Sequence, residues 1–404
     1  MEHLCRFGSQ VEKRIGEHRG VLYFAWHRKS HSHNGNLQAW TEKWRVYADG
    51  AIGSNPLLTE INARREWIHN DLFLFLSFPA DGKEHAEQQL LEHAYAWRSE
   101  WSGGFAATAG IEGEEPVGMI LHAGAAVIES DGDDPIEEAV FKAVKKAIVQ
   151  GDTPCALERS LKRKTLERFI NEKSIYPVYQ PIRSLNRDAV FGYEALTRCP
   201  DNDWFKGPLE LFAFAEADGF GYALDRLARE KAIGVGNGLN SDQKLFINLM
   251  TQAVEDSGFT PGRTRTLLES YGLQPSNVVF EITERSSIND FAAVKKALGY
   301  YRSQGYQIAI DDVGAGYSSL QSIVELRPDF IKVDRSIIRH IDTDEMKEHT
   351  LYTLQQLADK MGISVIAEGI EREEELLKVS RMGIPYGQGY LLGRPSAMTV
   401  DRSI

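Results

Sequence analysis

Residues 308–320 read Ile-Ala-Ile-Asp-Asp-Val-Gly-Ala-Gly-Tyr-Ser-Ser-Leu. An apolar, β-branched run ends in two adjacent carboxylates, Asp311 and Asp312, and a glycine-rich turn follows. Neighbouring side chains of a strand point to opposite faces, so these two acids cannot both be ordinary surface charges. Paired acids at the end of a buried strand are costly unless a cation compensates them. The segment therefore predicts a strand with a divalent-metal site at its carboxyl end.

Strand-like and helix-like segments alternate from Ile175 onward. Repeated β-then-α order favours a parallel sheet with right-handed crossovers, and eight such strands match a (β/α)8 barrel. The alternative is an open doubly wound sheet, but no Gly-x-Gly-x-x-Gly turn follows the first strand, so the barrel is preferred. The predicted strands are Tyr176–Ile182, Ala189–Leu196, Lys244–Leu249, Val278–Ile282, Gln307–Asp311, Phe330–Val333, Ser364–Ala367 and a last one near Gly387–Leu391.

Polar side chains close or follow each of these predicted strands. In a barrel they would gather at the C-terminal rim, where active sites of this fold lie. Carboxylate and amide oxygens suit Mg²⁺ or Mn²⁺ rather than zinc, and two ions would neutralise the acids and activate water toward a phosphoryl group. Lys332 could orient or deprotonate that water and stabilise negative charge. The set is Gln180, Glu194, Asn248, Glu281, Asp311, Asp312, Lys332, Glu368 and Gln388.

Each of these residues also has an ordinary structural explanation when taken alone. An isolated Asp-Asp-x-Gly is more often a helix cap or turn than a catalytic element. A lone Lys332 would be a surface lysine, and the two glutamines could simply satisfy backbone groups. It is their joint occurrence at consecutive strand ends that favours metal ligation. Glu371 is left out because a solvated charge at a helix start explains it equally well.

Six sequence blocks resemble the signatures of EAL-domain phosphodiesterases. They occur in order within Leu157–Pro395. The resemblance implies a barrel that hydrolyses cyclic di-GMP to linear pGpG with two Mg²⁺ or Mn²⁺ ions. The blocks are Tyr193-Glu-Ala-Leu-Thr-Arg198, Phe280-Glu-Ile-Thr-Glu284, Asp311–Leu320, Ile331-Lys-Val-Asp334, Ala367-Glu-Gly-Ile-Glu371 and Gln388-Gly-Tyr390.

The same resemblance implies a role for each matching residue. Lys332 would hold the nucleophilic water, and Gln388 would steady that neighbourhood. Glu284 would hold the loop after Asp312 in place. Arg198, whose planar fork suits a phosphate, and Gln180 would contact the substrate, although Arg198 could instead form a salt bridge at the rim. The implied ligands are Glu194, Asn248, Glu281 and Asp311 for one metal ion, and Asp311, Asp312 and Glu368 for the other.

Two residues depart from the family pattern. Val313 stands where phenylalanine is common, and Met250 stands where a small polar residue is usual. Neither change removes a ligand, but both could alter loop rigidity and basal activity. The resemblance further implies a homodimer formed by the EAL domain near the loop after Asp312.

Length and composition predict the number of domains, the class of partner and the cellular compartment. A length of 404 residues favours two domains, and Gly151-Asp-Thr-Pro154 is the best boundary, giving domains 1–153 and 157–404. The formal net charge of −12 argues against binding a nucleic-acid polymer. Three scattered cysteines suggest a reducing compartment. With no membrane span and no signal-peptide core, the chain is predicted to be cytoplasmic.

The N-terminal part predicts a smaller α+β domain. Strands are expected at Asp71–Phe78 and Met119–Ile128, and helices at Glu84–Trp101 and Pro135–Gln150. The order faintly resembles the second half of a GGDEF domain, with 69–73 (His-Asn-Asp-Leu-Phe) in place of the signature loop. Both glycines and the catalytic glutamate are missing, which argues against a cyclase. A degenerate GGDEF-like regulatory module and another sensor or interaction domain remain open.

The histidines His27, His31 and His33 suggest a metal site, but nearby acids and cysteines are lacking, so a polar loop is the preferred interpretation.

For the whole chain, the leading hypothesis is a metal-dependent cyclic di-GMP phosphodiesterase that its N-terminal domain regulates. The alternatives are a non-catalytic cyclic di-GMP receptor and a pure interaction scaffold. The complete set of metal-binding acids with Lys332 favours the enzyme.

Overall fold

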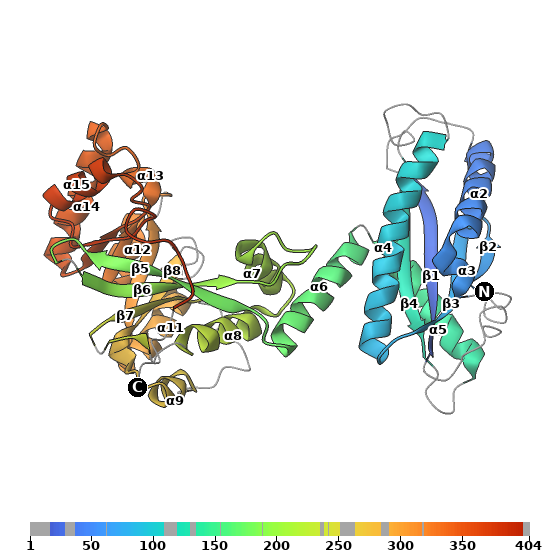
Figure 1. Cartoon of the computed structure of the whole chain (residues 1–404), viewed down its shortest axis with the longest axis horizontal. Helices are drawn as coiled ribbons and strands as arrows, with labels where there is room; N and C mark the ends of the chain where they lie inside the picture. The colour runs from blue at the N-terminus through green and yellow to red at the C-terminus, as the bar shows by residue number, and fades with distance from the viewer. Residues whose placement is uncertain are drawn as a thin grey trace. The chain divides into compact units, whose positions relative to one another are not determined.

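The computed structural model describes residues 17–28, 37–61, 63–108, 119–129, 135–153, 155–187, 189–234, 238–240, 242–250, 263–283, 291–316 and 319–398. The chain forms two compact units, Met1–Thr165 and Leu166–Ile404 (Figure 1). The division falls inside helix α6 (Ala156–Asn171), just beyond the boundary predicted at 151–154. Within the described ranges, no helix has both the length and the apolar character needed to cross a membrane.

The N-terminal unit is built on a four-stranded antiparallel sheet in the order β2-β3-β1-β4. Helix α5 covers one face of this sheet, where Val140 and Val144 pack with Tyr23 and Phe73. The predicted strands and helices of this unit are confirmed, although α4 is longer than expected. The elements are β1 (Glu17–Arg28), α2 (Leu37–Ser54), α3 (Pro56–Glu60), β2 (Arg64–Ile68), β3 (Asp71–Pro79), α4 (Lys83–Thr108), β4 (Met119–Ile128) and α5 (Ile136–Asp152).

The C-terminal unit is the predicted closed eight-stranded barrel, with strand order β10-β11-β12-β5-β6-β7-β8-β9. Its strands are β5 (Tyr176–Ser184), β6 (Ala189–Arg198), β7 (Lys244–Asn248), β8 (Val278–Thr283), β9 (Gln307–Val313), β10 (Phe330–Val333), β11 (Ser364–Ala367) and β12 (Tyr386–Gly387). Its helices are α7 (Pro208–Ala217), α8 (Gly221–Ile233), α9 (Arg263–Ser270), α11 (Phe291–Ser303), α12 (Ser319–Leu326), α13 (Arg335–Ile338), α14 (Glu345–Met361) and α15 (Glu373–Arg381).

The prediction of an all-parallel sheet is wrong for β5. This strand pairs antiparallel with β6 on one side and with β12 on the other. The physical reason is the short connection between Ser184 and Ala189, which can close a hairpin but cannot form a crossover of a dozen or more residues. As a result β5 passes the rim in the opposite direction, and Gln180 lies directly across from Glu194.

Two further details differ from the prediction of polar residues at strand ends. Glu194 lies inside β6, which continues to Arg198, because the hairpin extends beyond the barrel layer. The last strand is Tyr386–Gly387 rather than 387–391, so Gln388 directly follows it. Val313, the atypical residue after the paired acids, is fully buried, and its carbonyl accepts the Asp334 N–H at 3.0 Å. The segment that follows Asp312 therefore starts from a fixed position.

Candidate metal centre at the barrel rim

A hydrophobic layer inside the barrel lies directly beneath a polar one. Side chains on one face of a strand recur every second residue, so the residue two positions nearer the rim also faces the interior. The hydrophobic layer consists of Ile182, Phe246, Val279, Ala309, Phe330 and Ile366. Two positions from each, in the same order, are Gln180, Asn248, Glu281, Asp311, Lys332 and Glu368. Strand periodicity alone thus brings these polar residues to one level of the barrel.

Lys332 is the centre of this polar layer. Its side chain is fully buried, and its ammonium group forms ion pairs with carboxylates from four different strands or strand ends. The Nζ–oxygen distances are 2.8 Å to Glu368, 2.9 Å to Glu281, 3.1 Å to Asp311 and 3.3 Å to Glu194. One positive charge therefore faces four acids, and the site has an excess of negative charge.

The pKa values reflect this imbalance. Burial raises the pKa of Glu281 and of Glu368 well above the ordinary value, and Lys332 offsets only part of that effect. Burial also disfavours the charged form of Lys332, but the surrounding carboxylates outweigh it and hold its pKa well above the usual range. Burial opposes ionisation of Glu194 too, yet Lys332 and the Gln388 amide lower the pKa of this carboxyl. Full ionisation of Glu281 and Glu368 thus requires more positive charge than Lys332 supplies.

The acids fall into two groups that could each hold a metal ion, and Asp311 belongs to both. In each group the potential ligand atoms lie within 4.8 Å of one another. Both carboxylate oxygens of Glu281 are buried, and one of them faces the Lys332 ammonium at 2.9 Å. Oxygens in that state fit a cation, and an all-oxygen donor set fits Mg²⁺ or Mn²⁺. The groups are Glu194, Glu281 and Asp311, and Asp311, Asp312 and Glu368.

The backbone of Asp312 explains how two consecutive residues serve one site. Asp312 has a φ of 58°, a left-handed conformation that side-chain-bearing residues rarely adopt. Regular strand alternation would send its carboxylate away from that of Asp311. The left-handed turn breaks the alternation, and the carboxylate joins the group of Asp311 and Glu368. Such a conformation at a site of clustered charge is consistent with a functional constraint.

A chain of hydrogen bonds connects Glu194 to the C-terminal segment. The Gln388 amide donates to Glu194 Oε2 at 2.6 Å and to Gln180 Oε1 at 3.2 Å. Gln180 in turn donates to the Gly393 carbonyl at 3.1 Å. Both glutamines are buried, and the chain fixes the orientation of the Glu194 carboxylate. The participation of Gly393 has no signal in the sequence, because any residue supplies a carbonyl.

Three predicted site residues are not joined to this network. Asn248 ends β7 at the rim, where its side chain is exposed. The Arg198 guanidinium donates to the carbonyl of its neighbour Thr197 at 2.9 Å. Glu284 lies outside the described residues.

The EAL domain profile matches residues 163–395, which is more than half of the chain. The chain belongs to the EAL family. Its EAL domain is 28% identical over 236 residues to the Probable cyclic di-GMP phosphodiesterase PdeG of Escherichia coli (strain K12), a match covering 57% of this chain and 46% of PdeG. It is 30% identical over 242 residues to the uncharacterised EAL-domain containing protein YkuI of Bacillus subtilis (strain 168), covering 59% of both chains. The match thus spans less than two thirds of the length of each of these relatives.

Solved structures of EAL proteins are also similar to this chain. The EAL enzyme Bd1971 in its cAMP- and cyclic-di-GMP-bound form has a TM-score of 0.55 at 27% identity, covering 70% of this chain and 80% of that one. The PaMucR phosphodiesterase in complex with c-di-GMP has a TM-score of 0.52 at 26% identity, covering 58% of this chain and 97% of that one. Both likenesses support the barrel architecture of this EAL domain.

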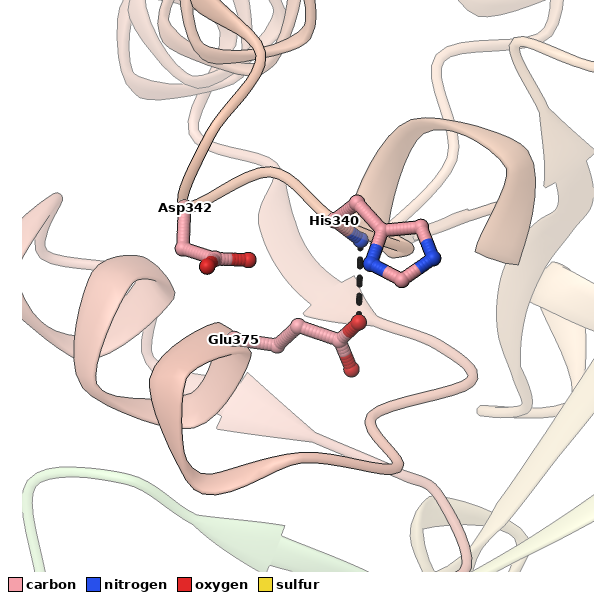
Figure 2. A group of neighbouring side chains, drawn as sticks. All are labelled: His340, Asp342 and Glu375. Atoms are coloured by element: carbon pink, nitrogen blue, oxygen red, sulfur yellow. Dashed lines mark hydrogen bonds between the residues drawn. The ribbon is translucent and has the colours of Figure 1, made fainter.

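A third group of potential ligands lies elsewhere in the EAL domain and already contains a cation. Figure 2 shows His340, Asp342 and Glu375, whose potential ligand atoms lie within 4.8 Å of one another. The backbone N–H of His340 donates a hydrogen bond to the Glu375 carboxylate. The Arg372 guanidinium lies 2.8 Å from His340 Nδ1 and within 3.3 Å of both Asp342 oxygens. Arginine therefore supplies the positive charge in this group, which we interpret as a structural ion pair.

The histidines near the end of β1 are only partly described. His27 stacks on His122 with ring centroids 4.3 Å apart, and its Nε2 lies 3.4 Å from Asp152. Parallel rings direct their nitrogens alongside each other rather than toward one ion. The polar-loop interpretation is wrong for His27, which lies in strand β1 because that strand pairs with β4 as far as Arg28. For His31 and His33, which lie outside the described residues, it stays a prediction.

Proposed function

We propose that the EAL domain hydrolyses cyclic di-GMP to linear pGpG with two Mg²⁺ or Mn²⁺ ions. The observation that supports this most directly is the pair of carboxylate groups that share Asp311 around a buried lysine. The names of PdeG and PaMucR support the substrate and the reaction class. Mg²⁺ or Mn²⁺ would supply Lewis acidity toward the phosphoryl oxygens and an activated water at neutral pH.

The protein residues would divide the work as follows. Glu194, Asn248 and Glu281 would hold one ion and Asp312 and Glu368 the other, with Asp311 shared between them. With these carboxylates engaged as ligands, the Lys332 ammonium would be released from part of its ion pairing. It could then donate a hydrogen bond to the attacking water and stabilise charge that develops on the phosphoryl group.

Substrate binding would fall to residues at the edge of the same layer. Arg198 now donates to a backbone carbonyl, a bond it could exchange for a phosphate oxygen at little cost because arginine forms stronger bonds to charged acceptors. Gln180 and Gln388 would border the substrate and keep Glu194 oriented. Glu284 would steady the segment after Asp312.

A chromatographic assay tests the proposed reaction. Purified protein is incubated with cyclic di-GMP and Mg²⁺ or Mn²⁺, and the linear product is followed over time. Glu194→Ala should abolish product formation, whereas Glu374→Ala, an exposed acid of α15, should leave it unchanged. If the wild-type protein binds the nucleotide but forms no more product than Glu194→Ala, the non-catalytic receptor is the correct interpretation.

We further propose that the N-terminal unit regulates this activity and that the protein acts in the cytoplasm, where a reducing environment suits its free cysteines. The β2–β3 hairpin turns at His69-Asn70, the position predicted for the degenerate GGDEF loop. A GGDEF-like origin of this unit stays a prediction. Kinetic comparison of the full chain with a variant that disrupts the N-terminal sheet, such as Val21→Asp, would show whether this unit changes turnover.

The proposed homodimer predicts a defined effect of charge on α12. Leu320 and Val324 are one turn apart on this helix, just after the segment that follows Asp312, and are 57% and 54% exposed. Replacing both by aspartate should yield monomers in sedimentation velocity, because a dimer interface would have to bury these new charges. Leu377→Asp, at a similarly exposed leucine on α15, is the matched control and should leave the dimer intact. A wild-type monomer would refute the dimer.

The raised pKa values of Glu281 and Glu368 predict an unusual pH dependence for the metal-free protein. A carboxyl whose pKa is higher in the folded state stabilises the fold below the ordinary value of 4.5, and this stabilisation is lost as the pH rises through the folded-state pKa. The free energy of unfolding should therefore fall above pH 4.5, by up to about 1.4 kcal/mol per pH unit for each group. Urea denaturation across this range checks it, and Glu281→Gln should reduce the slope. Equal slopes for both proteins would contradict the prediction.

A further inference from the structure

A buried ion pair lies on α8, outside the carboxylate groups. Asp225 and Arg229 are one helical turn apart, and they are 2% and 5% exposed. The Arg229 guanidinium donates to Asp225 Oδ2, and it also donates to Tyr301 Oη and Thr264 Oγ1, both at 3.2 Å. A buried ion pair is no more stable than a well-packed apolar pair of the same size, so stability alone does not account for it.

The two oxygens of Asp225 have different partners. While Oδ2 pairs with Arg229, Oδ1 accepts the backbone N–H of Met250 at 3.0 Å. Met250 is the second residue after Asn248, beyond the end of β7. The residue between them, Leu249, donates its N–H to the Glu281 carbonyl at 2.8 Å. Both residues that follow Asn248 are thus held by their backbone, one to β8 and the other to α8.

This arrangement matters for the side chain of Asn248, because strand pairing with Glu281 in β8 holds only the backbone of this residue. Its side chain is exposed and makes no hydrogen bond with any described residue. The direction of its amide therefore depends on the backbone on either side of it. The same ion pair reaches the neighbouring strand, since Arg229 lies 5.8 Å from the centre of the Phe280 ring, next to Glu281.

We infer that Asp225 is a positioning residue that holds Asn248 in a metal-binding orientation through the Met250 N–H. The Arg229 guanidinium holds the other oxygen, Asp225 Oδ2, and so fixes the direction of the carboxylate. The inference rests on the proposed function, because it requires an ion at the group that contains Glu194, Glu281 and Asp311. Met250, whose side chain departs from the family pattern, takes part through its backbone alone, so this departure leaves the anchor intact.

Two double variants separate positioning from simple stability. D225N/R229M and D225L/R229M both replace the ion pair by a neutral pair and lose the same Arg229 contacts. The two side chains at position 225 are similar in size and branching, but only asparagine keeps an oxygen acceptor for the Met250 N–H. Mn²⁺ binding to the full chain, measured from the free Mn²⁺ signal in electron paramagnetic resonance, needs no substrate and no turnover. D225N/R229M should bind like the wild type, and D225L/R229M should bind about 10- to 100-fold more weakly.

The controls make each outcome informative. Adding N248A to both double variants should erase the difference between them, because coupled residues give non-additive effects. If D225L/R229M does not fold, Met250→Pro removes the donor instead and should give the same loss with the ion pair intact. Equal Mn²⁺ affinity with and without the acceptor would overturn the inference. Absence of Mn²⁺ binding in the wild type would instead overturn the proposed function.

Discussion

Replacing Lys332 by methionine is expected to reduce phosphodiesterase turnover by about 10²- to 10³-fold, the loss typical for a donor that stabilises transition-state charge. The same change should destabilise the metal-free protein by about 3–5 kcal/mol, because removing one member of a buried ion pair leaves the others uncompensated. Here the remaining members are the buried carboxylates of Glu194, Glu281, Asp311 and Glu368. Urea denaturation without metal and turnover with saturating Mn²⁺ measure the two effects separately.

A charge-balanced variant distinguishes these two roles of Lys332. K332M/E281Q removes the lysine together with one buried acid, so it should recover much of the lost stability. It should not recover turnover, because it lacks both the donor to the attacking water and one of the proposed metal ligands. Turnover close to that of the wild type in K332M would show that the lysine is only structural. An unchanged free energy of unfolding would show that the ion pairs do not form in solution.

Replacing Asp311 by asparagine is expected to affect both metal groups at once. Asp311 is the one residue that the two groups have in common, and one of its oxygens lies 3.1 Å from Lys332. Loss of its charge should weaken Mn²⁺ binding at both positions. Residues that only support a metal ligand typically contribute about 10- to 100-fold, so the loss of this proposed ligand should lower turnover by more than about 100-fold. Isothermal titration with Mn²⁺ gives the affinity and the number of sites.

Single-group variants provide the matched comparison for D311N. Glu194→Gln alters only the group with Glu281, and Glu368→Gln alters only the group with Asp312. Each should weaken one of two Mn²⁺ sites and leave the other near its wild-type affinity. If D311N weakens only one site, or if the wild type binds a single ion, the shared-ligand geometry does not describe the loaded protein.

Most of the barrel and its polar layer could be predicted from the sequence, because both depend on local periodicity. Apolar strands that end in acids, as at Glu281 and Glu368, signal an interior that turns polar at the rim. The antiparallel direction of β5 could also have been predicted, because the connection from Ser184 to Ala189 is too short for a crossover.

Other features depend on tertiary contacts that no local pattern encodes. The left-handed backbone of Asp312 follows from the position of its neighbours, since the residue type favours such a conformation only weakly. The anchor from Asp225 to the Met250 N–H joins a helix to a loop through a backbone donor that every non-proline residue has. For the same reason, the bond from Arg198 to a backbone carbonyl could not be foreseen.

The closure of the barrel has a consequence for how the protein is made. β12 consists of two residues and pairs with β5, and Tyr179 and Ser396 exchange backbone hydrogen bonds of 2.8 and 3.0 Å. These contacts join the first strand of the barrel to nearly the last described residues, a very long separation along the chain that slows folding. The chain must therefore be synthesised at least as far as residue 388 before Gln388 can reach Glu194 and Gln180. The polar layer around Lys332 is therefore complete only after all the strands from β5 to β12 have been synthesised.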